Sequence, residues 1–203
     1  MLKLILAIAL CFGLAGGVAA APITWQLTGQ VIAVGPTPPP GVAVGQSATA
    51  VITFEPATAD QDSAPEFGFF GGALLSWTLT IPAAGFSESF PPFSANTIQT
   101  FVGISRLELN AFPGTNNATL DLQINSTVPF SSDAIPSTPP PFNLNNTSNQ
   151  IFRQQQGQGG NFLAIHIGAI SVVPEPRLAL LCALGIGALG LARSVGWRST
   201  SES

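Results

Sequence analysis

The stretch LLSWTLTI at residues 74–81 alternates apolar side chains with small hydroxyl side chains. Large apolar residues recur at every second position from Leu75 to Ile81, and Ser or Thr fills the positions between them. A period of two residues is that of a β-strand with one buried and one solvated face. The stretch therefore predicts a strand that packs on a hydrophobic core through Trp77.

The same alternation recurs through the central part of the chain. It is clear at 23–34, 45–55 and 117–128, and weaker at 99–112 and 161–173, whereas no central segment has a helical period. Turn-forming Pro and Gly residues separate these stretches. Amphipathic strands joined by such turns form antiparallel sheets, and two sheets can pack on their apolar faces. We therefore predict an all-β domain at residues 21–173, built as an antiparallel β-sandwich.

The composition excludes several classes of function. Charged residues make up 8% of the chain, about a third of the usual share, and the formal net charge is −4. Arg106 and Arg153 are the only basic residues between 21 and 173, too few for a nucleic-acid-binding surface. Cys11 and Cys182 lie outside that range, and His166 is the single histidine. The domain therefore lacks the residues for a disulfide, a thiolate metal site or a multi-histidine metal site.

The first twenty residues have the organisation of a signal peptide. Lys3 supplies a positive charge, Leu4 to Leu14 is apolar, and small residues follow. We expect cleavage after Ala20, because a cut one residue later would place Pro22 beside the scissile bond. Residues 1–20 are thus predicted to be a signal peptide, with an uncleaved membrane anchor as the alternative.

The last thirty residues have the features of a membrane tail. Leu178 to Ala192 is an uninterrupted apolar run. A helix of that length is too short to span a bilayer, but it extends to about residue 196 if Arg193 reaches the interface. Arg193 and Arg198 form the basic cytoplasmic flank. We predict one transmembrane helix at about 178–196; a buried core helix is the alternative.

The sequence Val173-Pro174-Glu175-Pro176, an apolar helix and a short basic end together resemble the PEP-CTERM sorting signal. The resemblance implies a secreted bacterial protein, made alongside exopolysaccharide and processed by an exosortase, a membrane-embedded cysteine protease-transpeptidase. It also implies that Pro174, Glu175 and Pro176 are the recognition motif within a sorting signal at 174–203. Proline keeps such a segment extended, which suits a protease cleft. Arg177 departs from the small polar residue that is common at this position.

The central part also resembles, more loosely, the ectodomain common in PEP-CTERM proteins. The shared features are a second strand at Ile52 to Glu55 followed by an acidic loop, and a late Phe-Ser-Ser-Asp segment at 130–133. A closing strand leads directly into the Pro-Glu-Pro motif. This resemblance implies no activity for the domain.

Two sets of acidic residues are candidate sites. Asp60, Asp62 and Glu66 form an acidic loop that offers oxygen ligands of the kind Ca²⁺ takes, with a solvated polar loop as the alternative. Glu108 and Asp121 lie on the polar faces of predicted strands and can be neighbours. A carboxylate pair is the machinery of glycoside hydrolysis, although sheet surfaces commonly carry such residues as solvated charges.

Other residues favour structural roles. His166 falls on the polar face of its strand, and a lone base without a positioned nucleophile is weak support for catalysis. Trp25 and Trp77 fall on apolar faces, which favours core packing over sugar stacking. The Phe-rich segments 67–70 and 86–93 are less clearly buried and are where we expect a ligand or partner patch.

From the sequence we therefore expect a secreted, non-catalytic surface or extracellular-matrix protein associated with exopolysaccharide. It is expected to pass through an inner-membrane intermediate held by its C-terminal helix and then to reach the cell surface or matrix. No cofactor is expected beyond the Ca²⁺ considered above, and no nucleic-acid partner. The alternatives are a carbohydrate-binding or adhesive module and, more remotely, a glycoside-active enzyme.

Overall fold

A computed structural model describes residues 21–92, 95–112, 118–155 and 160–174. These residues form ten β-strands and a short 3₁₀ helix, η1, at Pro82–Ala84. The strands in chain order are β1 Ile23–Val34, β2 Ser47–Phe54, β3 Phe67–Gly71, β4 Leu74–Ile81, β5 Phe86–Phe90, β6 Thr97–Phe101, β7 Arg106–Ala111, β8 Ala118–Asn125, β9 Gln150–Gln155 and β10 Phe162–Val173.

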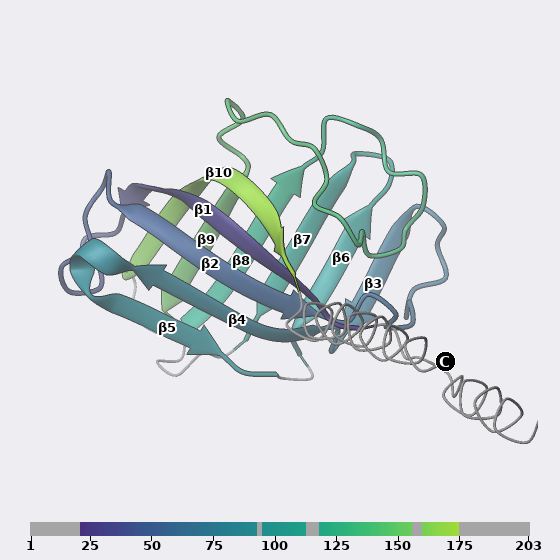
Figure 1. Cartoon of the computed structure of the whole chain (residues 1–203), viewed down its shortest axis with the longest axis horizontal. Coiled ribbons are helices and arrows are strands. Elements are labelled where there is room, and N and C mark those ends of the chain that lie inside the picture. The colour runs from purple at the N-terminus through teal and green to yellow at the C-terminus, as the bar shows by residue number, and fades with distance from the viewer. Residues whose placement is uncertain (1–20, 93–94, 113–117, 156–159, 175–203) are drawn as a thin grey trace, which may run out of the picture.

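All ten strands belong to one antiparallel sheet in the order β3-β6-β7-β8-β9-β10-β1-β2-β4-β5. The sheet curls, so that a front half (β1, β2, β4, β5) lies over a rear half (β3, β6, β7, β8, β9), with β10 joining the two (Figure 1). The predicted all-β, antiparallel fold is confirmed. The expected pair of separate sheets is instead one continuous sheet, because β10 pairs with β1 on one side and β9 on the other.

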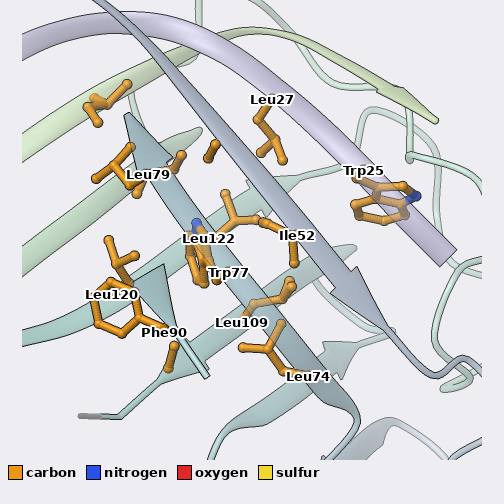
Figure 2. Close-up of a cluster of buried hydrophobic side chains, with 14 of the residues drawn as sticks. Trp25, Leu27, Ile52, Leu74, Trp77, Leu79, Phe90, Leu109, Leu120 and Leu122 are labelled. Carbon is orange, nitrogen blue, oxygen red and sulfur yellow. The ribbon is translucent and has the colours of Figure 1, made fainter. Parts of the chain in front are cut away.

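The core lies between the two halves of the curled sheet. Trp25, Ile52 and Trp77 point inward from the front half, and Leu109 and Leu122 meet them from the rear half (Figure 2). Trp25 packs edge-on against Phe54, with the ring centroids 4.9 Å apart. Burial alternates along the whole of β2 and along β8 from Leu120 onward, which is why the period-two pattern located the core faces of these strands correctly.

The strand positions correct the sequence-based expectations in three places. The segment predicted as one weak strand at 99–112 is a hairpin of β6 and β7. The Phe-rich segments 67–70 and 86–93 contain strands β3 and β5, the two edges of the sheet. Strand β9 has no predicted counterpart, because in its sequence QIFRQQ the buried face carries Ile151 and the charged Arg153, and the partly exposed Phe152 stands between them.

The long connection between β8 and β9 covers the part of the core that the front half leaves open (Figure 1). The hydroxyl of Thr100 on β6 donates to the carbonyl of Asp133 in this connection. Ile135 is buried in the core cluster, and Gly68 on β3 allows the backbone at Asp133 to approach closely. The segment 130–133, picked out by resemblance, therefore closes the core above β3 and β6.

A buried ion pair joins the two halves near the edge of the front half. Arg153 on β9 donates from Nε to Glu88 Oε2 at 2.9 Å and from Nη2 to Glu88 Oε1 at 3.2 Å. Both side chains are about 2% exposed or less. A two-point arginine–carboxylate contact fixes the relative position of the strands that carry it. The pair thus connects edge strand β5 to β9 across the core.

Within the described residues, no helix is long and apolar enough to cross a membrane. The predicted signal peptide at 1–20 lies outside these residues. So do Glu175, Pro176, the predicted helix at 178–196 and its flanking Arg193 and Arg198. Pro174, the first residue of the expected sorting motif, directly follows β10.

Candidate functional site

A row of polar side chains crosses six strands on the outer face of the sheet, from β6 in the rear half through β10 to β1 in the front half. Cross-strand partners in the sheet follow one another along this row: Gln99, Glu108, Gln123, Gln150, His166 and Gln30. A second row beside it runs through Asn110, Asp121 and Phe152. Their inward-facing neighbours fill the core, so both rows face solvent. The sequence predicted the polar faces but not this alignment, which depends on strand order and register.

The two rows border a shallow hollow of about 330 Å³, which we call the outer hollow. Its lining comes from β7, β8 and β9: Glu108, Asn110, Asp121, Leu122, Gln123, Gln150 and Phe152. The neighbour relation expected for Glu108 and Asp121 is confirmed. Asp121 lies opposite Asn110, two positions from Gln123, the partner of Glu108.

The two carboxylates of the outer hollow have different environments. Partial burial, reinforced by the negative charge of Glu108, raises the pKa of Asp121 above its usual value. Glu108 has a basic neighbour instead, with Arg106 Nε 3.0 Å from Glu108 Oε1. The Arg106 guanidinium also lies 4.5 Å from the centroid of the Phe101 ring. The negative charge of Glu108 is therefore balanced by Arg106, whereas no ion pair is seen for Asp121 among the described residues.

One aromatic ring, that of Phe152, lines the outer hollow on the β9 side. Phe152 on β9 stacks on Phe162 of β10, with the ring centroids 5.6 Å apart and the planes inclined by 30°. Both rings are partly exposed, whereas phenylalanine is most often buried in the core. Amides, carboxylates and a partly exposed ring on one surface can hydrogen-bond and stack a polyhydroxylated ligand.

The raised pKa of Asp121 leads to a stability prediction. In the unfolded chain this carboxyl ionises near its model value of 3.8, whereas in the folded domain it ionises at higher pH. Its contribution to the free energy of unfolding therefore falls as pH rises from the unfolded to the folded pKa, and then stays constant. We expect Asp121→Asn to be more stable than the parent at pH 7, by up to about 1 kcal/mol given the solvent screening.

Urea unfolding of the full chain at pH 3.5 and pH 7 checks this expectation. The gain from Asp121→Asn should be present at pH 7 and much smaller at pH 3.5. Glu108→Gln is the matched control, since it removes a charge from the same surface but also breaks the ion pair with Arg106. An Asp121→Asn variant less stable than the parent at pH 7 would contradict the assignment.

The acidic loop considered for Ca²⁺ has a structural contact that the sequence did not predict. Asp60 Oδ1 accepts a hydrogen bond of 2.9 Å from the backbone N–H of Phe69 on edge strand β3. The neighbouring Gln61 donates its backbone N–H to the Phe69 carbonyl at 2.9 Å. Asp62 Oδ1 accepts from the N–H of Ala64 at 2.7 Å, within the loop. Asp60 and Gln61 thus cover the free backbone edge of β3.

The third residue of that loop, Glu66, is exposed. Among the described residues, no group of three or more His, Cys, Asp or Glu side chains could hold a metal ion. The Asp60 carboxylate is engaged by two backbone donors, Phe69 and Asp62. The structure therefore gives this loop a role in protecting a sheet edge, which unpaired would offer donors and acceptors to another chain.

Asp60→Ala is expected to uncover the edge of β3. Loss of two charge-assisted hydrogen bonds should cost about 1–3 kcal/mol and promote concentration-dependent association. Light scattering after size-exclusion chromatography measures the association. Asp62→Ala is the control, because its carboxylate bonds only within the loop. Equal association of the two variants would contradict edge protection by Asp60.

The remaining sequence candidates fall where their patterns indicated. Trp25 and Trp77 are fully buried, so core packing is confirmed and neither can stack on a sugar. Their indole N–H groups find no hydrogen-bond partner among the described residues. His166 lies on the outer face, partly exposed, with Nε2 3.3 Å from the carbonyl oxygen of Asn146. No nucleophilic side chain is among the described partners of His166.

Comparison of the chain with protein-family models, with curated proteins and with solved structures finds no match in any of the three. The function of the chain must therefore be inferred from its own residues and their arrangement.

Proposed function

We propose that this chain is an exported, non-catalytic surface or extracellular-matrix protein, sorted through its Pro-Glu-Pro signal. The observation that carries the proposal is the pairing of the first and last strands. Thr24, near the start of β1, lies opposite Val173 at the end of β10. The expected cleavage point after Ala20 and the motif beginning at Pro174 therefore adjoin the same end of the sheet.

This geometry suits a domain held at one end. A leader and a tail that leave from the same place put both membrane-directed segments on one side of the β domain. Strand β10 runs from there for up to roughly 36 Å, at about 3.3 Å per residue. The opposite end, at Val34 and Phe162, would then point away from the membrane. The resemblance to exosortase substrates implies a further step, in which the tail is cleaved at Pro174–Pro176.

The processing step is tested by the intact mass and the C-terminal peptide of the protein recovered from its native host. A chain that ends near Pro174–Pro176 and lacks 178–203 is the expected result. Glu175→Ala should leave the tail attached, whereas Arg177→Ser, outside the motif, should be processed at least as well as the parent. A parent chain in the membrane fraction that still carries 178–203 would contradict sorting and mean a permanent anchor.

A second candidate function is saccharide binding, which the outer hollow favours. Asn110, Gln123 and Gln150 supply neutral donors and acceptors beside the partly exposed ring of Phe152. Uncharged sugars are recognised by such groups together with an apolar face. In this proposal the outer hollow binds matrix polysaccharide without cleaving it.

The arrangement of the carboxylates argues for binding over hydrolysis. Glycosidases place two carboxyl groups on either side of the scissile bond. Glu108 and Asp121 instead project side by side from neighbouring strands of one open surface, and Arg106 is ion-paired with Glu108. Incubation of the protein with neutral polysaccharides should release no reducing sugar. Release that disappears in both Glu108→Gln and Asp121→Asn would overturn this proposal.

A further inference from the structure

A second and larger cavity opens at the end of the sheet opposite Thr24 and Val173. It has a volume of about 460 Å³ and lies between the β1–β2 connection, the β4–β5 turn and the ends of β9 and β10. We call it the distal cavity, and its lining is Pro39, Pro40, Ala84, Gly85, Phe86, Ser87, Arg153, Gln155 and Asn161. Its volume falls within the range of small-molecule sites.

The floor of the distal cavity is polar but electrically neutral, and its partly exposed side chains are the amides of Gln155 and Asn161 above the buried Arg153. Arg153 lines the cavity while its charge is compensated by Glu88, at 2.9 and 3.2 Å. Arg153 Nη1 also donates to Asn161 Oδ1 at 2.8 Å, and Asn161 Nδ2 donates to Gln155 Oε1. These bonds hold Arg153, Asn161 and Gln155 in one arrangement. A preorganised polar group binds a ligand at a lower entropic cost than a mobile one.

The walls of the cavity combine apolar surfaces with further polar groups. The partly exposed Phe86 ring and the rings of Pro39 and Pro40 supply the apolar surface. Ser87 adds a hydroxyl at the exposed rim. The Arg153 guanidinium lies 6.0 Å from the centroid of the Phe86 ring. The apolar side of the cavity is therefore next to its polar floor.

We infer that the distal cavity binds a single uncharged sugar unit, as a free saccharide or as part of a neutral polysaccharide. Compensation of Arg153 by Glu88 disfavours a strongly charged ligand, since a second carboxylate beside Glu88 would be repelled. The amides of Gln155 and Asn161 and the hydroxyl of Ser87 can bond ring hydroxyls, and Phe86 offers a face for the C–H groups of the ring. The inference deepens the proposed matrix function and rests on it for its setting, whereas the binding itself does not depend on export.

Saturation-transfer NMR on the full chain tests the inference. The protein is held in a zwitterionic detergent without a sugar head group, and the probes are glucose, galactose, mannose and rhamnose, with glucuronate as the charged comparison. Transfer to at least one neutral sugar and a much weaker effect with glucuronate are expected. Transfer to none of the neutral sugars, or to glucuronate alone, overturns the inference.

Variants locate the binding. Ser87→Arg places a long charged side chain at the cavity rim without removing a group of the floor, and should weaken binding at least tenfold. Ser89→Arg is the matched control, since Ser89 is exposed on the same strand and does not line the cavity. Phe86→Ala removes the apolar wall and should also weaken binding, with a thermal-unfolding scan to check that it is folded.

Phe152→Ala separates the distal cavity from the outer hollow, because Phe152 lines only the latter of the two. Binding lost in Ser87→Arg and retained in Phe152→Ala supports the distal cavity. The reverse pattern overturns it and assigns the sugar to the outer hollow. Tail processing is measured separately by mass, so a failure of sorting is not mistaken for a failure of binding.

Discussion

Arg153→Met is expected to lower the free energy of unfolding by about 3–5 kcal/mol, because it leaves the buried carboxylate of Glu88 without its cation. The two side chains form a two-point contact between β9 and β5. A desolvated carboxylate that has lost its cation is costly to keep inside a protein, and this cost disfavours the folded state. The loss is measured by urea unfolding of the full chain in zwitterionic detergent.

Arg106→Met is the matched control, since Arg106 and Arg153 are the only basic residues between 21 and 173 and both are ion-paired. The Arg106 side chain is 28% exposed, and its Nε has no partner with hydrogen-bond geometry. A solvent-exposed pair of this kind contributes about 1 kcal/mol at most. Similar losses in the two variants would contradict the distinction between the pairs.

The double variant Glu88→Leu with Arg153→Met separates the value of the pair from the cost of an unpaired charge. Replacing both partners by apolar residues is often neutral or stabilising. We therefore expect the double variant to recover most of the stability lost in Arg153→Met. It should not recover sugar binding in the distal cavity, because Arg153 no longer holds Asn161 in place.

The sequence predicted the elements whose two faces differ most in polarity. For β1 and β4 the predicted bounds match the structure, since apolar and polar residues alternate there with few exceptions. Strand β5 was not recognised because Glu88 and Phe90 share its inward face, so a charge stands where the pattern requires an apolar residue. The same reason hid β9, where Arg153 shares the inward face with Ile151. The two charged residues of the buried ion pair are thus the reason that β5 and β9 could not be predicted from the alternation of apolar and polar residues.

The sequence likewise predicted part of the outer hollow and almost nothing of the distal cavity. That Glu108 and Asp121 can be neighbours followed from the strand pattern, and their actual offset required the register of β7 with β8. The distal cavity gathers residues from three stretches far apart in the sequence, 39–40, 84–87 and 153–161, so no local motif identifies it. One signal was available: the Phe-rich segment at 86–93 was where a ligand patch was expected, and Phe86 lines the distal cavity.

The seam between β1 and β10 holds the two halves of the sheet together, and Gly29 is the position where it has no room for a side chain. A Cβ atom at Gly29 would overlap the backbone carbonyl of His166. The register shifts between Thr28 and Gly29, which leaves the two backbones unusually close at that point. Gly29→Ala can be accommodated only by separating β1 from β10, so we expect a loss of about 3 kcal/mol or more in the free energy of unfolding.

Gly168→Ala provides the control on the other strand of the same seam. There the nearest atom to a new Cβ is the carbonyl oxygen of Thr28 at 3.6 Å, an ordinary contact. Its effect should stay within about 0.5 kcal/mol, and its smaller unfolded-state entropy can even favour folding. For a chain exported as proposed, Gly29→Ala should also reduce the amount of domain exported, because a less stable domain is more readily degraded. Equal stability and equal export of the two variants would show that the seam tolerates separation and that the curl does not depend on it.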